Sequence, residues 1–350
     1  MRILILGNDY CTKEFYGLFS KDKKNIVFAT NSSLQNYVDL SCTKDILDFC
    51  EANEINFVLI TDIDLINQGL QEAITSIGIS AFAPSIDAIA ICSSKSYAKK
   101  FMYKNKIKTP KFFIAEKPQL ALDYFKNATT PQAIKPDYNS YQECPCFCET
   151  YSNAQKTINN LFVSGNERII LEDYIEGKNI SFWVLSNGYS VKIIGTSAKY
   201  QNNIALFEPD FITDELKEKI YDEIIMPAIS ALSNQDEEYI GILGFDLILD
   251  YNNQVHLIGF NHFFDDINVD FYLKGFNVDW AQVFDSTLVG DVFQKHEIKP
   301  KDEYMLTIRQ NEKIHFISAK TKNNLERYLQ ELDFDLKEYY EAKKIWKYWV

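Results

Sequence analysis

No apolar stretch of this 350-residue sequence is long enough to span a lipid bilayer. Met1 leads directly into the apolar residues 3–6, without the charged and hydrophobic leader of a secreted protein. Acidic residues outnumber basic ones, the net charge is −13, and no Lys/Arg stripe interleaved with aromatic residues stands out. This charge would repel a nucleic-acid backbone. We therefore expect a cytoplasmic protein with neither a membrane nor a nucleic-acid partner.

Several motifs of catalysis and metal binding are missing as well. The first apolar segment ends at Gly7 without the G-x-G-x-x-G spacing of a dinucleotide site, and no nucleophile elbow or Ser/His/Asp pattern is present. The seven cysteines, an odd number, favour reduced thiols over a disulfide framework. Three of them, Cys144, Cys146 and Cys148, alternate along one predicted strand, but their spacing is not that of a zinc site. We interpret them as buried structural thiols, with a soft-metal site as the alternative.

The segments that are present indicate a folded α/β protein. Hydrophobic residues make up 46% of the chain and charged residues 24%, which is typical of globular proteins, and the length suits two or three domains. The apolar runs 2–7, 25–29 and 56–60 alternate with helical patterns. Such alternation predicts a doubly wound parallel sheet over residues 1–93.

Four further units are expected after this sheet. In chain order they are a linking segment built on an amphipathic helix, a small α+β lobe of short strands and one helix, a large lobe of longer strands and helices, and a reduced C-terminal module. Their predicted bounds are 94–111, 112–176, 177–292 and 293–350. The linking helix is expected to bury Tyr97, Phe101 and Met102. Thr213 is expected to cap a helix of the large lobe, and the alternating segments 304–309 and 313–317 predict a hairpin in the C-terminal module.

A polar residue in a buried hairpin is the first candidate for a functional site. Two apolar runs within residues 239–261 flank a polar turn and predict two antiparallel strands. Regular alternation would put Leu257, Gly259 and Asn261 on one face, with Asp246 opposite Gly259 or Asn261. A carboxylate beside an amide oxygen forms half of a magnesium site, and a buried carboxylate is costly unless it is paired or metal-bound. Asp246 and Asn261 are therefore candidate metal ligands, with a purely polar site as the alternative.

Lysines and acids of the small lobe are weaker candidates. Lys135 lies in a predicted strand, where an ammonium group is out of place unless it meets an anion such as a phosphate. A strand-edge lysine that reaches water is equally consistent with the pattern. Residues 172–175 end another strand, where backbone groups and one carboxylate could meet a purine, or where the acids are simply solvated. Lys95, at the start of the linking helix, has the weakest signal when taken alone.

Taken together, these segments resemble the ATP-grasp superfamily, and within it the glycinamide ribonucleotide synthetases, also called phosphoribosylamine–glycine ligases. The resemblance runs from residue 1 to the region of Val292 and consists of many modest matches in the same order. They are Arg2–Asn8, Phe82–Ser85, Ser94–Met102, Ile107–Pro110, Ala133–Asp137, Leu171–Gly177, Thr213–Leu216, Ile225–Ala228, Tyr239–Leu243 and Gly259–Asn261. The C-terminal module is shorter than that of the family and matches poorly.

The resemblance implies a mechanism and a set of ligands. In the family, ATP phosphorylates a substrate carboxylate, and an amine attacks the acyl phosphate to give an amide, while magnesium neutralises the phosphates. For this chain it implies ATP and Mg²⁺ as cofactors, and a small-molecule carboxylate and amine as substrates. The positions concerned are Lys95 and Lys135 as phosphate-binding lysines, Glu172, Asp173 and Ile175 as the adenine hinge, Asn179 where the family has a ribose-binding acid, and Asp246 and Asn261 as metal ligands.

Other positions depart from the family. The segment 138–145 falls where the family has a glycine-rich flap, but it contains no glycine and carries Glu143 near where a lysine is expected. Gly259 stands in place of the metal-bridging glutamate, which removes a bidentate ligand. Phe263 falls near the position of a substrate-binding arginine, and residues 201–207 replace a glycine-rich substrate loop.

Two hypotheses follow, and the catalytic residues are unassigned in both. In the first, the chain is a ligase of altered substrate choice that holds ATP and a single magnesium ion through Lys95, Lys135, Asp246 and Asn261. Candidate replacements for the missing carboxylate are Asp250, Asp265 and Asp266. In the second, it is a catalytically silent relative that keeps the fold and weak nucleotide binding to serve a partner protein or a regulatory role. The loss of one metal carboxylate favours the second for the glycinamide reaction itself, since charge neutralisation is the main contribution of such an enzyme. Both hypotheses need a groove between the two lobes, with Lys135 on one wall and Asp246 on the other.

Overall fold

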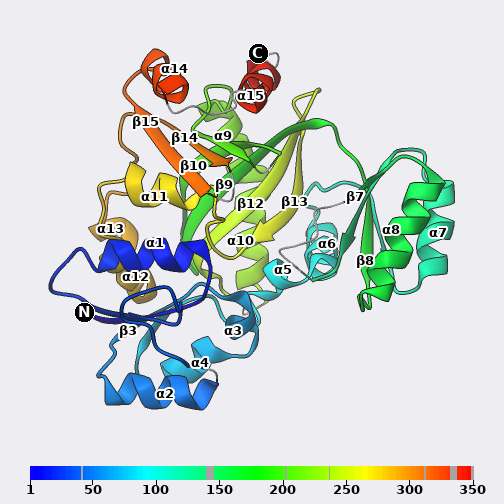
Figure 1. Cartoon of the computed structure of the whole chain (residues 1–350). Helices are drawn as coiled ribbons and strands as arrows, with labels where there is room; N and C mark the ends of the chain where they lie inside the picture. Colours follow the sequence, from blue (N-terminus) through cyan, green and yellow to red (C-terminus); the bar gives the residue numbers. More distant parts are fainter. Residues whose placement is uncertain are drawn as a thin grey trace.

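The computed structural model describes residues 1–40, 42–138, 146–201, 203–235, 237–310, 313–331 and 337–347. Within these ranges the strands form three sheets, of four, seven and four strands. Figure 1 shows the seven-stranded sheet at the centre, the N-terminal sheet at one end of the molecule and the third sheet projecting to one side. The predicted α/β class is confirmed, with a parallel sheet first and antiparallel sheets after it.

The N-terminal sheet is parallel, as predicted. Its elements are β1 (Arg2–Leu6), α1 (Tyr10–Phe19), β2 (Ile26–Ala29), α2 (Thr43–Ala52), β3 (Phe57–Ile60), α3 (Ile63–Asn67), α4 (Leu70–Ser76) and β4 (Ser80–Phe82), in the strand order β2-β1-β3-β4. Leu4 and Leu6 of β1 pack in the core that includes α2 and α4, while Ile3 and Ile5 pack on the other face with Phe15 of α1. A strand that is apolar on both faces needs helices on both sides of its sheet, so the fold is doubly wound.

A small antiparallel sheet forms the second unit, the lid lobe (residues 112–173). Its elements are β5 (Phe112–Ala115), α7 (Pro118–Asn127), β6 (Gln132–Pro136), β7 (Cys146–Cys148), α8 (Tyr151–Val163) and β8 (Ile169–Asp173), in the sheet order β5-β8-β6-β7. Two helices, rather than the one predicted, bury Leu122, Phe125 and Ile158 against this sheet (Figure 1). The helices α5 (Ala90–Ser93) and α6 (Lys95–Lys104) lead into the lobe. Helix α6 buries Phe101 and Met102 as predicted, whereas Tyr97 is only half-buried.

The central sheet is antiparallel and is built around two long strands, β9 (Gly177–Asn187) and β12 (Ile240–Asp250). Its other strands are β10 (Val191–Tyr200), β11 (Ile204–Phe207), β13 (Val255–Asn261), β14 (Tyr304–Gln310) and β15 (Lys313–Ala319). The strand order is β13-β12-β9-β10-β11-β14-β15. The predicted C-terminal hairpin, β14 and β15, pairs with β11 and so extends this sheet.

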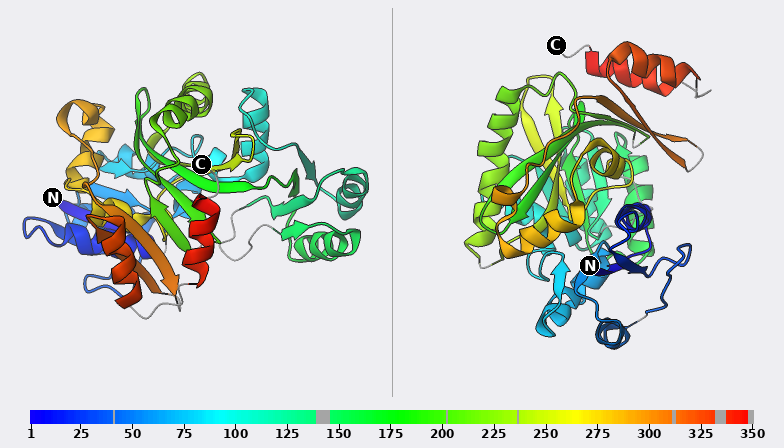
Figure 2. Two further views of the ribbon diagram at one scale, coloured as in Figure 1. Left: turned by 90° about the horizontal axis from the view of Figure 1, so that it is seen from above. Right: turned by 90° about the vertical axis from the view of Figure 1, so that its left-hand side faces the viewer.

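Helices cover both faces of the central sheet. One face carries α9 (Asp214–Ile220), the π-helical turn η1 (Tyr221–Ile225) and α10 (Met226–Ser233), and the other carries α11 (Val269–Gly275), α12 (Trp280–Val289) and α13 (Val292–Lys295). The predicted cap Thr213 begins α9, since its hydroxyl accepts a hydrogen bond from the Leu216 backbone N–H at 3.3 Å. The helices α14 (Lys322–Glu331) and α15 (Lys337–Lys347) lie at the end opposite the N-terminal sheet (Figures 1 and 2). Among the helices in the described ranges, none has the length and apolar character needed to cross a membrane.

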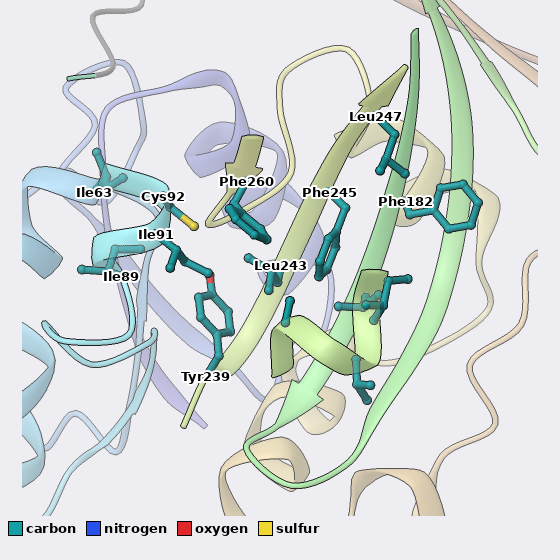
Figure 3. Close-up of a cluster of buried hydrophobic side chains, with 14 of the residues drawn as sticks. Ile63, Ile89, Ile91, Cys92, Phe182, Tyr239, Leu243, Phe245, Leu247 and Phe260 are labelled. Carbon is teal, nitrogen blue, oxygen red and sulfur yellow. The ribbon is translucent and has the colours of Figure 1, made fainter. Parts of the chain in front are cut away.

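The two faces of the central sheet differ in chemistry. Leu243 and Phe245 of β12 point to the face that carries α10, where Figure 3 shows them within one apolar cluster. Each such fully buried side chain stabilises the fold by about 1.5–3 kcal/mol. On the opposite face, Trp183 of β9 is buried with α11 and α12. Two residues before it on the same strand, Ser181 pairs with Asp246, and the face is polar at this point. The central sheet is therefore apolar through most of its area but polar at one end of one face.

A β-bulge changes the predicted facing of the hairpin side chains. The register passes from the pair Asp246 and Gly259 to the pair Leu247 and Leu257, so Ile258 is an extra residue on β13. Because residues paired across antiparallel strands share a face, Leu257 lies with Leu247 in the core and Gly259 lies with Asp246 on the polar face. The pairing of Asp246 with Gly259 is confirmed. The prediction that Leu257 shares the face of Gly259 is wrong, because strict alternation makes no allowance for an inserted residue.

Candidate functional site

A cavity of about 560 Å³ lies between the lid lobe and the polar face of the central sheet. One wall comes from β6 and β8, the other from β9, β10, β12 and β13, and residues of α5 and α6 close one side. The cavity lining includes every residue predicted from the sequence for a nucleotide or metal site, namely Lys95, Lys135, Glu172, Asp173, Ile175, Asn179, Asp246 and Asn261. The groove on which both hypotheses depend is therefore present, with Lys135 on the lid wall and Asp246 on the sheet wall.

The carboxylate of Asp137 brings Lys95 and Lys135 to the same cavity. Asp137 Oδ1 accepts hydrogen bonds from the Ser96 backbone N–H at 2.7 Å and from the Ser94 hydroxyl at 2.8 Å. The Lys95 backbone N–H donates to the Asp137 carbonyl oxygen at 2.9 Å. An acid at a helix N-terminus satisfies N–H groups that the helix itself leaves unpaired. The end of β6 is thus fastened to the first turn of α6, and the lysines of the two elements line one space.

A buried charge cluster forms the lid wall of the cavity. Glu172 lies between Lys99, whose Nζ is 2.6 Å from Glu172 Oε2, and Lys135, which pairs with the other carboxylate oxygen. Burial alone would raise the pKa of Glu172, but the ammonium groups of Lys135 and Lys99 outweigh burial and hold the pKa below its ordinary value. Burial also lowers the pKa of Lys99 to about 8, although Glu172 opposes this shift. With two ammonium groups sharing one carboxylate, the cluster carries a net positive charge and favours an anion in the cavity.

The end of β8 contributes a polar anchor and an apolar surface. The Asp173 carboxylate accepts hydrogen bonds from the Thr130 hydroxyl at 2.8 Å and from the Gln132 side-chain amide at 2.9 Å, which fixes the strand end. The rings of Phe147 and Tyr174, with centroids 4.4 Å apart, both line the cavity. The Glu172 carboxylate is already paired with lysines. The groups that remain for a planar base are therefore the backbone of the predicted hinge and these two rings.

At the sheet end of the cavity, Asp246 is held by three donors. The Ser181 hydroxyl donates to Oδ1 at 2.7 Å, the Asn261 side-chain N–H donates to Oδ2 at 2.7 Å, and Lys199 Nζ lies 3.3 Å from Oδ1. Lys199 Nζ also lies 2.6 Å from Asp265 Oδ2. Burial would raise the pKa of Asp246, but Lys199 and the two other donors lower it below its ordinary value. Burial would lower the pKa of Lys199, but Asp246 and Asp265 raise it above its ordinary value, so the ammonium stays charged.

This donor set does not fit a magnesium ion as it stands. Both oxygens of Asp246 accept hydrogen bonds, and Asn261 directs its N–H group, rather than its carbonyl oxygen, toward the carboxylate. Gly259, the cross-strand partner of Asp246, supplies no ligand. Magnesium requires a near-octahedral set of oxygens, and no group of three or more His, Cys, Asp or Glu side chains in the described part of the chain could hold a metal. The assignment of Asp246 and Asn261 as metal ligands stays a prediction.

The three acids considered as substitutes for the missing carboxylate have different surroundings. Asp250 accepts backbone hydrogen bonds within the turn between β12 and β13 and pairs with His256 at 2.9 Å. Asp266 lies 3.4 Å from Arg309. Asp265 is the one of the three that approaches the Asp246 end, through its contact with Lys199.

Several departures from the family lie away from the cavity or outside the described residues. Phe263 packs in the core, with its ring centroid 5.4 Å from that of Phe15, so the position of the expected arginine faces the interior. The segment 139–145, with Glu143 and Cys144, lies outside the described residues. Of the other two cysteines in that row, Cys148 is buried as predicted, whereas Cys146 is exposed and the prediction of a buried thiol is wrong there.

Three residues that shape the site escaped the sequence analysis. Lys99 is one of several lysines on the linking helix, so its burial beside Glu172 had no distinct signal. Ser181 is an ordinary small residue of a strand. Lys199 follows the small and polar residues Thr196–Ala198, so its burial in a strand had no distinct sequence signal either.

Comparisons with known proteins identify the family of the sequence and the relatives of the fold. The family model described as phosphoribosylglycinamide synthetase, ATP-grasp (A) domain, matches residues 93–269. Phosphoribosylamine–glycine ligase of Neisseria meningitidis serogroup A is 25% identical over 316 residues, which cover 83% of this chain and 74% of that protein.

Solved structures share the fold. Phosphoribosylamine–glycine ligase of Thermotoga maritima aligns with a TM-score of 0.73 at 15% identity, over 95% of this chain and 96% of that one. The biotin carboxylase domain of Hydrogenobacter thermophilus 2-oxoglutarate carboxylase, solved with MgADP, ADP and bicarbonate, aligns with a TM-score of 0.70 at 15% identity, over 88% of this chain and 74% of that one. The family match spans just over half of the sequence, including α6, the lid lobe and the sheet wall of the cavity. This chain therefore belongs to the phosphoribosylglycinamide synthetase ATP-grasp (A) domain family.

Proposed function

We propose that this protein binds ATP in the cavity and uses it as a carboxylate–amine ligase, joining a small-molecule acid to an amine through an acyl phosphate. One observation carries the proposal: eight positions that such a site would use, spread over two lobes and the linking helix, line a single cavity. Related folds support it, since the biotin carboxylase domain with this fold was solved with MgADP.

The lid wall is suited to hold the nucleotide. The rings of Phe147 and Tyr174 offer an apolar surface to the base, and Lys135 brings a buried positive charge to the phosphates. Lys95 adds a second ammonium group, 3.5 Å from the carbonyl oxygen of Tyr138. Charges that are already fixed in a site of low dielectric stabilise a transferring phosphoryl group without reorganising during the reaction. Binding and phosphoryl transfer would therefore depend on the same lysines.

The proposed reaction has two steps. A carboxylate oxygen of the acid attacks the terminal phosphorus of ATP, and ADP leaves. The amine then attacks the acyl carbon, phosphate leaves with the bonding electrons, the attacking nitrogen loses a proton to water or to the departing phosphate, and an amide remains. Phe263 packs in the core near where the family carries a substrate-binding arginine, so we propose that the acid or amine differs from that of the glycinamide reaction.

Calorimetric titration with ATP and ADP tests binding, and phosphate release with panels of acids and amines tests the ligase. Lys135→Ala should weaken ATP binding at least about tenfold, equivalent to roughly 1.4 kcal/mol. Glu172 keeps Lys99 as a partner in this variant, so the lid lobe should still fold. The matched control is Lys126→Ala, which removes a lysine that is 53% exposed on the same lobe. Equal affinities for the two variants, or no nucleotide binding by the unmodified chain, would contradict the proposal.

A second candidate function is a nucleotide-binding module that no longer turns over and instead serves a partner protein. The observation that favours it is the incomplete metal set at Asp246, where Gly259 supplies no carboxylate. Under this alternative, ATP binds and Lys135→Ala weakens it, but no acid and amine stimulate phosphate release. Release above the background of the Lys135→Ala variant with any acid and amine pair would exclude the alternative.

A further inference from the structure

A lysine ammonium lies between two carboxylates at the sheet end of the cavity. Lys199 Nζ is 3.3 Å from Asp246 Oδ1 and 2.6 Å from Asp265 Oδ2. We propose that this ammonium is the protein's own cation at this end of the cavity, so that the site takes no divalent metal ion and the nucleotide binds without magnesium. The statement about the nucleotide rests on the proposed function, whereas the statement about the metal does not.

The carboxylate of Asp246 has little capacity left for a metal ion. Its Oδ1 accepts from Ser181 and faces Lys199, and its Oδ2 accepts from Asn261, so each oxygen already meets a donor. The three donors occupy three of the roughly four lone-pair positions of the carboxylate, so a metal ion bound through both oxygens would have to displace at least one of them. It would also approach Lys199, whose charge has the same sign.

The sheet, rather than a mobile loop, holds Lys199 in this position. On β10 it pairs with Asn179 of β9 on one side and with Ala205 of β11 on the other. Its side chain is only 12% exposed, although it carries a charge. A charge buried to this extent requires its partners, because a buried ion pair that loses one member costs several kcal/mol.

Gly259 accounts for the missing carboxylate and indicates how a metal site could be rebuilt. It pairs with Asp246, and a Cβ added to it would meet no atom within 4 Å. A side chain at position 259 would therefore begin in open space beside Asp246. With Lys199 made neutral, two carboxylates on neighbouring strands would face each other and attract a hard cation.

Metal binding in the absence of nucleotide tests the first statement, with Mn²⁺ followed by electron paramagnetic resonance as the probe. The unmodified chain should bind no Mn²⁺ below about 1 mM, and the double variant Lys199→Met with Gly259→Glu should bind one ion at least about tenfold more tightly. The control Lys192→Met removes a lysine of the same strand that is not among the cavity residues, and should behave like the unmodified chain. Tighter binding by the unmodified chain that Asp246→Asn abolishes would overturn the proposal. The proposal would also be overturned if the double variant folds but binds Mn²⁺ no more tightly than the unmodified chain.

Nucleotide titrations with and without metal test the second statement. The Kd of ADP in EDTA and in excess Mg²⁺ should agree within about threefold for the unmodified chain. Lys199→Met should weaken binding in EDTA about tenfold, and Lys199→Arg, which keeps the charge, should weaken it less. A gain of more than about tenfold on adding Mg²⁺ to the unmodified chain would overturn the statement. If no variant binds nucleotide in either condition, the proposed function fails, while the Mn²⁺ titration still decides the role of Lys199.

Discussion

One carboxylate, that of Glu172, keeps two buried ammonium groups in place at the lid wall of the cavity. The side chains of Lys99 and Glu172 are 2% and 4% exposed, so both charges have lost almost all their water. Removing such ions from water costs several kcal/mol each, and their attraction offsets this cost only when every partner is present. The cluster thus contributes to the position of Lys135 more than to net stability.

Replacing Glu172 with glutamine should therefore be strongly destabilising. The variant leaves two buried ammonium groups without a counter-ion, and we expect the free energy of unfolding to fall by about 3–5 kcal/mol in urea denaturation at neutral pH. The control Glu176→Gln changes an exposed glutamate of the same segment and should stay within about 0.5 kcal/mol.

The stability that the Glu172 carboxylate contributes should depend on pH. The pKa of Glu172 in the folded state is below its ordinary value of 4.5, which the unfolded chain should show. Its contribution is therefore complete above pH 4.5 and is lost as the pH falls through the lower, folded-state pKa. The stability difference between the unmodified chain and Glu172→Gln should shrink below pH 4.5. A difference that is constant with pH, or that grows in acid, would show that the carboxylate does not carry this effect.

A glycine of β12 lies directly against a buried tryptophan ring of β9, close to the site. Gly244 of β12 pairs with Trp183 of β9, and a Cβ at position 244 would lie 2.6 Å from a ring atom of Trp183. The tryptophan is fully buried and packs against Phe264, with ring centroids 5.3 Å apart. Glycine is required here by the close approach of the indole, and Asp246 follows two residues further along the same strand.

Gly244→Ala should consequently destabilise the central sheet. The added methyl group has to displace a buried indole, which costs about 1–3 kcal/mol in overpacked cores. Gly259→Ala, on the adjacent strand β13, adds the same group in open space and should change stability by no more than about 0.5 kcal/mol. Urea denaturation of both variants provides the comparison, and equal losses would contradict the packing argument.

The lid lobe and the central sheet together form the walls of the cavity, so a nucleotide bound there would contact both units. Binding to the folded state alone raises the free energy of unfolding by about 2.7 kcal/mol at a ligand concentration of one hundred times Kd. For a chain of this length we expect the melting temperature to rise by roughly 3–5 °C in scanning calorimetry with ATP. Lys135→Ala should reduce the rise at the same ATP concentration, while Lys126→Ala should keep it. If neither ATP nor ADP raises the melting temperature, the prediction that a nucleotide binds in the cavity is wrong.

Much of the architecture followed from local patterns. The three N-terminal β segments, the helix at 95–104, the cap at Thr213 and both C-terminal strands lie where hydrophobic periodicity and capping residues predict them. The second lid helix and the bulge at Ile258 were missed. A bulge is one residue long and leaves no periodic trace, yet it reverses the face of every side chain beyond it.

For the site, single residues could be recognised but their partners could not. Lys135 and Asp246 stand out in the sequence because a charge inside an apolar strand needs a reason, and both line the cavity. The pairs Lys99 with Glu172 and Lys199 with Asp265 join residues that are 73 and 66 positions apart in the sequence. Such meetings depend on strand order, register and the docking of the lid, which are set by packing across the whole chain. Local composition therefore determined which elements form, and long-range packing determined that an ammonium group, in place of an acid, lies beside Asp246.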